Sequence, residues 1–413
     1  MYRHSVLKEL CKEEDLILRE LAGDFAEQEI IPVREQIDDD EDHVIVKGLL
    51  QGLANLGFIR AIFPERFGGS DIRSAVTLGL PLEEIARGDA GVAVALACCL
   101  WPFMPAIWAG NQAVLDHFGP MFCGDELRIG CFNMTEPGGS TGGGGCDTEN
   151  PGMEGRKIRT MAKLDGSEWV LNGQKIWASN SGIADAYLMV CTTDPTLGDE
   201  GIALIYVPGD VAGLSFGAFE KKAGMAADRN TSTYLDNVRV PRSFRLSGPG
   251  DDAKYFHANL TVGRLASAAM SVGSAQGALE TVLDFTADRV VGNPGKAIRD
   301  HSVAACMLAD MAIGIETARM TYLTGAYRFD HPEQYGAIHS LEQLSYASIA
   351  KVYAADMAVT LTNRAMELMG SYGYVRECHL EKYWRDTKII QLWEGGGQVG
   401  RFDVCRPYYD LPL

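Results

Sequence analysis

The stretch KIRTMAKLDGSEWVLNGQKIWASN, residues 157–180, alternates apolar and polar side chains and contains the pairs Asp165-Gly166 and Asn172-Gly173. Alternation with a period of two indicates half-buried strands, and both pairs favour tight turns between strands. The runs AYLMVCTTD, GIALIYVP and TSTYLDNVRVP continue this pattern further along the chain. We therefore expect a central β-sandwich or barrel domain over residues 125–245.

Helical patterns flank this domain on both sides. Residues 7–31 carry apolar side chains at helical spacing, and GLLQGLANLGF (48–58) repeats the period and ends at a glycine cap. After the β-rich region come three long amphipathic segments and a fourth around EKYWRDTKIIQLW (381–393). The expected fold is a multi-domain α+β protein, with an N-terminal α-helical domain over 1–124 and a C-terminal four-helix bundle over 246–413.

Composition excludes several classes of partner. The net charge of −18 argues against nucleic acid or an anionic membrane surface, because both require a basic face. The ten cysteines form no CxxC pair and no Cys/His metal spacing, which is typical of reduced thiols in a cytoplasmic protein without a bound metal. The charged N-terminus lacks the apolar core of a signal peptide.

One apolar stretch bears on membrane insertion. Residues 90–115 contain no charged side chain, a length that is sufficient to cross a bilayer. Pro102 and Pro105 interrupt the stretch, and no basic flank follows it. We expect a buried helix, a turn and a second helix, with no membrane span.

Three short motifs carry candidate chemistry. The glycine-rich MTEPGGSTGGGG (134–145) has no P-loop ending; its backbone is suited to approach a flat or phosphorylated ligand, or to form a flexible surface loop. In KIWASN, Trp177 and Ser179 share one side of a strand, an arrangement that fits a ring cofactor or a Trp packed into the domain. In IIQLWEGGGQVGR (389–401), burial would raise the pKa of Glu394 and make it a general base, although a plain helix end has the same pattern.

Together these motifs resemble those of the acyl-CoA dehydrogenase family of flavoenzymes. The resemblance covers essentially the whole chain and depends on five stretches in the family's order: CFNMTEPGG, LNGQKIWASN, YLDNVRVP, MGSYGYVRECHLEKYWRDTKI and IIQLWEGGGQVGR. It implies FAD as cofactor, with contacts at Met134, Thr135, Thr141, Trp177, Ser179, Arg289, Gly396 and Gln398. It also implies Glu394 as the catalytic base, with substrate contacts at Arg264, Gly395 and Trp101.

The reaction implied by the resemblance is α,β-dehydrogenation of an acyl-CoA thioester. Glu394 would remove the α-proton, and a hydride would pass from the β-carbon to FAD. Electrons would then go to an electron-transfer flavoprotein, and the protein would be a homotetramer. A flavin oxidase or monooxygenase on the same fold, or a catalytically inactive scaffold homologue, are the alternatives.

The sequence departs from the family pattern near the substrate. Glycines replace the usual Gly-Thr-Ser after the Glu, so only backbone remains there. Ala93 stands where glutaryl-CoA members carry an Arg, which disfavours a short dicarboxylic substrate unless Arg229 or Arg376 enters the pocket. Trp101 favours a compact, branched or cyclic acyl group. Asp89 is either a second base of the kind used by ring-specific members or a helix-start residue.

Overall fold

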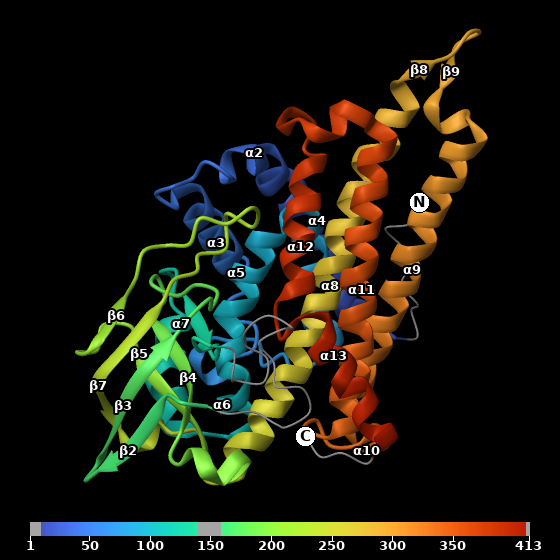
Figure 1. Cartoon of the computed structure of the whole chain (residues 1–413). Coiled ribbons are helices and arrows are strands. Elements are labelled where there is room, and N and C mark those ends of the chain that lie inside the picture. The colour runs from blue at the N-terminus through green and yellow to red at the C-terminus, as the bar shows by residue number, and fades with distance from the viewer. Residues whose placement is uncertain (1–9, 139–157, 410–413) are drawn as a thin grey trace.

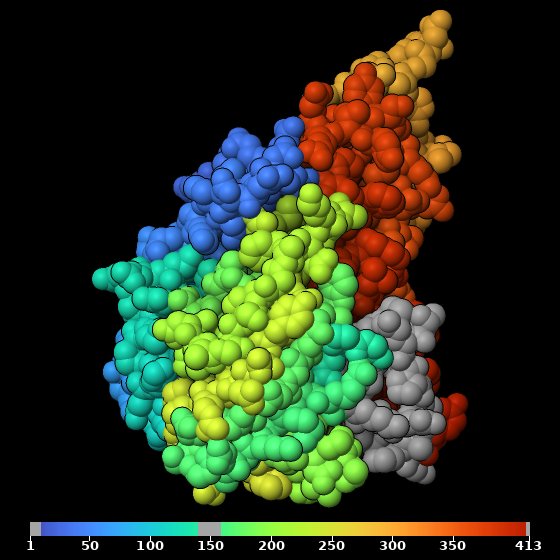
Figure 2. All heavy atoms as spheres, turned by 60° about the vertical axis from the view of Figure 1, so that its left-hand side comes forward, coloured from blue at the N-terminus to red at the C-terminus, as the bar shows by residue number. Residues whose placement is uncertain are grey.

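In sequence order the chain forms a helical unit, a sheet and a second helical unit. The sheet lies at the left of the molecule and the long C-terminal helices at the right (Figure 1). This computed structural model describes residues 10–138 and 158–409. Thr141, one of the expected cofactor contacts, lies outside the described residues. The N-terminal helices and the sheet occupy one half of the molecule, and the C-terminal helices form the other half (Figures 1 and 2).

The N-terminal unit consists of short helices packed around buried aliphatic and aromatic side chains. A π-helical turn, Ala26–Ile30, follows the first helix directly. The helices are α1 Glu13–Phe25, α2 Arg34–Ile37, α3 Val44–Asn55, α4 Ala75–Gly88, α5 Ala90–Leu100, α6 Met104–Ala109 and α7 Gln112–Phe122.

In the described part of the chain, seven strands form one curled sheet in the order β1-β4-β2-β3-β7-β6, with β5 paired to β4. Strands β1 and β4 run parallel, and most other neighbours are antiparallel. The strands are β1 Gly130–Asn133, β2 Met161–Asp165, β3 Glu168–Lys175, β4 Ala186–Thr192, β5 Ile202–Pro208, β6 Leu214–Phe216 and β7 Thr233–Pro241.

One of the two predicted turns is present and the other is wrong. Asp165 and Gly166 join β2 to β3, as expected. Asn172 and Gly173 lie inside β3, where the pairing with β7 shifts register between Leu171 and Gly173. A β-bulge therefore uses the Asn-Gly pair that the sequence pattern assigned to a turn.

The C-terminal unit is a bundle of long helices that includes the predicted fourth helix. The small hairpin β8–β9 projects from one end of the bundle, away from the sheet (Figure 1). The elements are α8 Asp251–Asp288, β8 Val290–Val291, β9 Lys296–Ala297, α9 Ser302–Asp330, α10 Pro332–Tyr335, α11 Leu341–Met369, α12 Leu380–Leu392 and α13 Gly396–Cys405.

The uncharged stretch after Asp89 folds as the sequence predicts. Helix α5, a 3-10 turn at Trp101–Phe103 and helix α6 follow one another. Among the described residues, the segment Ala90–Ala109 is long and apolar enough to cross a membrane, but 78% of its most apolar window is buried inside the protein. Its apolar character is therefore that of a core segment.

A buried cluster of charges joins the three units. The Lys382 ammonium on α12 lies 3.1 Å from Asp38, 2.9 Å from Asp89 and 3.0 Å from Asp386. Asp386 in turn accepts a hydrogen bond from the backbone N–H of Met225, in the loop that precedes β7. Burial opposes the charge of Lys382, but the three carboxylates raise its pKa.

Helix α8 packs closely against α4 because it carries glycine at the contact. A Cβ atom added to Gly273 would collide with the backbone carbonyl of Glu83. Both backbones are helical and cannot give way separately, so a side chain at this position would force the two helices apart.

We predict that Gly273→Ala lowers the melting temperature, because overpacking of a core contact costs about 1–3 kcal/mol. Gly48, inside α3, offers a matched control, since a Cβ there meets no atom within 4 Å. Gly48→Ala should be neutral or stabilising because alanine favours the helix. Thermal melts followed by circular dichroism check both variants, and equal melting temperatures would contradict the close packing.

Candidate active site

Glu394 lies in a tight loop between two helices. Helix α12 ends at Leu392 and α13 begins at Gly396. Glu394 has φ +55°, and Gly395 and Gly396 follow with φ +87° and +69°. Three consecutive left-handed residues form the turn that separates α12 from α13, and a non-glycine residue in that region is strained. The glycines thus let the backbone present the Glu394 side chain towards α8.

Helix α8 makes room for this carboxylate. A Cβ atom added to Gly263 would lie 2.8 Å from Glu394 Oε1 and would collide with the ring of Trp101. One turn later, the Ser267 hydroxyl lies 3.4 Å from Glu394 Oε2 and accepts a hydrogen bond from the indole N–H of Trp393 at 2.9 Å. The acid is therefore enclosed by two tryptophans and a glycine, with one hydroxyl as its polar neighbour.

The surroundings of Glu394 favour its neutral form. Burial raises the pKa of its carboxyl group, and the cations Lys351 and Arg264, with the Ser267 hydroxyl, oppose that rise. Lys351 is itself held by the backbone carbonyl of Trp393, at 2.9 Å. A carboxyl group with a raised pKa beside a cavity fits a general base for a weakly acidic proton.

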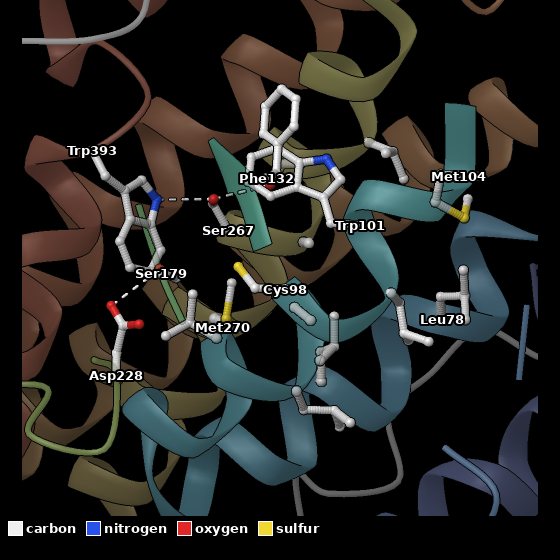
Figure 3. A pocket seen from close by; sticks show the side chains of 18 of the residues that line it. Leu78, Cys98, Trp101, Met104, Phe132, Ser179, Asp228, Ser267, Met270 and Trp393 are labelled. Atoms are coloured by element: carbon white, nitrogen blue, oxygen red, sulfur yellow. Dashed lines mark hydrogen bonds between the residues drawn. The ribbon is translucent and has the colours of Figure 1, made fainter. Parts of the chain in front are cut away.

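A cavity of about 770 Å³ extends from this acid to residues of all three units. Most of the residues that the sequence singled out line it, namely Met134, Thr135, Trp177, Ser179, Glu394, Gly396 and Trp101. Figure 3 shows Trp393, Ser267 and Ser179 towards one end of the cavity, with Leu78 and Met104 towards the other. Trp101 stands between these groups in that view and donates its indole N–H to the carbonyl of Asn259.

The β-domain provides one wall of the cavity. The Trp177 side chain is 53% exposed, and its backbone has φ +66°. The backbone of Thr135 accepts a hydrogen bond from Ile176 N–H, so the MTEP segment and the Trp177 segment are fixed side by side. Lys175 is fully buried and bonds both Met134 O and the Glu136 carboxylate, which anchors the same segment.

Four expected site residues lie outside this cavity in the described structure. Arg264 is buried behind Glu394, where it pairs with Asp403 at 2.6 Å. Arg289 lies beside the projecting hairpin and stacks over the Tyr372 ring. Gln398 is an exposed residue of α13, and Gly395 adjoins Glu394 without lining the cavity.

The sequence left the roles of three charged residues undecided, and in the structure all three make contacts that stabilise the fold. Asp89 caps α5 by accepting the Val92 N–H at 2.9 Å and pairs with Lys382, so its helix-start interpretation is confirmed. Arg229 donates to the backbone carbonyls of residues 40 and 41, and Arg376 pairs with Asp39. Neither arginine lines the cavity.

Sequence reasoning missed Gly263, Ser267, Asp228 and Lys351, all of which lie within the site or directly behind it. Gly263 and Ser267 belong to the same helical segment as Arg264, and nothing in its sequence pattern indicates that they face the site. Lys351 could have been found from the sequence, because it is a cation within the run SIAKVYAADMA, in which most other residues are small or apolar. A lysine with 2% exposure requires buried acceptors, and two carbonyls at the end of α12 supply them.

Comparison with known proteins agrees with this geometry. The chain is 31% identical to a probable acyl-CoA dehydrogenase, fadE25, of Mycobacterium bovis, over 92% of each chain. It is 29% identical to cyclohexane-1-carbonyl-CoA dehydrogenase of Syntrophus aciditrophicus, over 92% of this chain and 93% of that one. Butyryl-CoA dehydrogenase from Megasphaera elsdenii superposes with a TM-score of 0.84 at 28% identity, covering 97% and 99% of the two chains.

The fold and the cavity define a three-domain flavoprotein oxidoreductase. Family models for the N-terminal, middle and C-terminal domains of acyl-CoA dehydrogenase match residues 12–126, 131–238 and 253–407. The chain belongs to the acyl-CoA dehydrogenase family, whose members are FAD-dependent.

The described residues fit the ring system of FAD. The exposed Trp177 indole offers a flat apolar face, and Ser179 and Thr135 place polar groups on the same side of the cavity. The glycine-rich segment that would approach the phosphates falls partly on residues outside the described structure.

We predict that the stability of Glu394→Gln relative to the native protein depends on pH. Because burial raises the folded-state pKa of Glu394, the native protein loses stability as pH rises through that value, and the variant does not. The variant should melt at a higher temperature at about pH 8, and the difference should vanish near pH 4, where the acid is protonated in both states.

The control is Glu377→Gln, which changes an exposed acid on the loop that precedes α12. It should show no pH-dependent difference. A melting-temperature difference for Glu394→Gln that is constant with pH would mean that the buried charge is not its origin.

Proposed function

We propose that this chain removes two hydrogens from the α and β carbons of an acyl-CoA thioester, with Glu394 as the base. The observation that supports this most directly is the single cavity shared by the Glu394 carboxyl group and the Trp177–Ser179 wall. A base and a ring-binding wall in one enclosed space are what a coupled proton and hydride removal requires.

In this mechanism Glu394 takes the proton from the α-carbon. The Ser267 hydroxyl, which accepts a hydrogen bond from Trp393, lies beside its carboxylate, and the apolar walls exclude the water that would otherwise lower its basicity. The backbone N–H of Glu394 has no acceptor among the described residues, so it can donate to the thioester carbonyl as negative charge develops there. Bound FAD would supply the acceptor for the hydride that leaves the β-carbon.

The substrate is proposed to carry a compact, branched or cyclic acyl group. Trp101 limits the space next to Glu394 and packs on Phe132 with ring centroids 4.8 Å apart. The adjacent walls are apolar and come mainly from α5 and α8, at Val94, Ala97, Cys98, Ala266 and Met270. The relative that acts on cyclohexane-1-carbonyl-CoA supports a ring in this position.

The physiological electron acceptor is proposed to be an electron-transfer flavoprotein, and the protein to act in the cytoplasm. The acceptor follows from the family resemblance, and the location from the cysteines, which show no disulfide or metal spacing. A flavin oxidase on the same fold is the competing function. Anaerobically reduced protein mixed with air separates the two, because a dehydrogenase keeps its flavin reduced for many seconds and an oxidase does not.

We predict that Glu394→Gln retains FAD but loses bleaching of the flavin by acyl-CoA, by at least about 100-fold in rate, the lower end for loss of a general base. The measurement is anaerobic stopped-flow absorbance with straight, branched, cyclic and aromatic acyl-CoA thioesters. Glu377→Gln controls for the loss of a carboxylate. Bleaching by the variant at the native rate would remove Glu394 from the proposed role, and no bleaching of the native protein by any thioester would favour an inactive scaffold.

We also propose a homotetramer, in which the face formed by α9, α11 and α13 is covered by another copy. This face contains a hollow lined by Met307, Met311, Ile349, Tyr353 and Met357. Val303 at its edge is 72% exposed. Exposed apolar surface of this kind marks a protein contact.

The expected result of light scattering on the native protein is four times the chain mass of 44.9 kDa. Ile349→Asp should reduce that mass, because a buried charge disfavours the contact. Glu367→Gln, an exposed change on the same helix, should leave it unchanged. A monomeric native protein would contradict the proposal.

A further inference from the structure

A second carboxylate, Asp228, lines the same cavity as Glu394 and takes no part in the mechanism above. It lies in the loop between β6 and β7 and is only 5% exposed. Its Oδ2 accepts hydrogen bonds from the Ser179 hydroxyl and the Asn230 amide, each at 3.1 Å. Its Oδ1 is buried and has no hydrogen-bond partner among the described residues.

The cationic side chains near Asp228 do not donate a hydrogen bond to Oδ1. The Lys222 ammonium lies 3.6 Å from Oδ2 and donates to the Asp228 carbonyl and to Asn230. Arg229, the next residue, donates its guanidinium to the backbone carbonyls of residues 40 and 41 instead. A buried carboxylate oxygen without a hydrogen-bond donor is destabilising, so a bound group with an N–H or O–H fits this position.

Asp228 belongs to the ring-binding wall. Ser179, which lines the wall, donates to it directly, as the dashed line in Figure 3 shows. Asn230 bonds both Asp228 and the backbone carbonyl of Trp177, so one amide connects the acid to the exposed indole. Glu394, by contrast, lies against helix α8, at Gly263 and Ser267. The two acids therefore occupy separate parts of the cavity.

We propose that Asp228 is a positioning and tuning residue for the flavin: Oδ1 accepts a hydrogen bond from an N–H of the isoalloxazine ring, and the fixed negative charge opposes negative charge on that ring. This rests on the part of the proposed function that places the ring against Trp177 and Ser179. Reduction adds electron density to the ring, and a nearby carboxylate makes that addition less favourable. The residue would thus lower the reduction potential of the bound cofactor, with Lys222 partly offsetting its effect.

The test measures the midpoint potential of the bound FAD by chemical reduction with dithionite in the presence of reference dyes, without acyl-CoA. Asp228→Asn keeps the shape and removes the charge, and should move the potential to a more positive value. Lys222→Met removes the compensating cation and should move it to a more negative value. Asp236→Asn, an exposed acid on β7, removes the same charge outside the cavity and should leave the potential unchanged.

The outcomes are distinguishable. Equal potentials for Asp228→Asn, Asp236→Asn and the native protein would overturn the proposal and leave a bound water as the partner of Oδ1. If Asp228→Asn fails to fold or to retain FAD, Lys222→Met decides, and an unchanged or more positive potential there overturns the proposal. Because no acyl-CoA is present, a protein that bleaches with no thioester but shows both shifts would refute the dehydrogenase function and retain this role for Asp228.

Discussion

The ion cluster at Lys382 is the interaction on which the geometry of the site depends. Its carboxylates come from the end of α2 (Asp38), the start of α5 (Asp89) and α12 itself (Asp386), and the β-domain contributes the N–H of Met225. Three of these four partners stand close to an element of the cavity. Helix α12 leads into the Glu394 loop, α5 forms the apolar wall, and the loop after Met225 carries Asp228.

Such a cluster contributes more to the relative placement of the three units than to the free energy of unfolding. Burying charges is costly, and burial raises the pKa of Asp386 while Lys382 lowers it. Apolar side chains of similar volume would stabilise the junction at least as well, but they would tolerate sliding between units. A lysine with three carboxylates within about hydrogen-bond distance has one favourable arrangement. This directional requirement explains how a cavity built from three units keeps a defined shape.

The sequence predicted those parts of the fold that depend on local pattern. Long helices such as α8 and α11 follow from apolar periodicity, and β4, β5 and β7 follow from their β-rich runs. The order of strands in the sheet did not follow, because the parallel pairing of β1 with β4 joins residues more than fifty positions apart. The Asn172-Gly173 pair shows the same limit, since the partner strand β7 decides between turn and bulge. The domain boundaries at residues 124/125 and 245/246 stay predictions.

The residues of the candidate site also fall into those that a local motif predicts and those that depend on tertiary contacts. Glu394, Trp177 and Ser179 could be named in advance because each lies in a recognisable motif, and the cavity brings them together. Gly263 and Asp228 could not, because their meaning depends on what faces them. Gly263 matters only because Glu394 and Trp101 lie against it, and Asp228 matters only because Ser179 turns towards it. Because the Ser179 hydroxyl already donates its proton to Asp228, it can offer a cofactor ring only its oxygen as a hydrogen-bond acceptor. The β-domain wall therefore carries a carboxylate beside the serine that the motif alone indicated. The two proposed roles, removal of the substrate proton by Glu394 and tuning of the ring by Asp228, thus fall to two acids on different walls of one cavity.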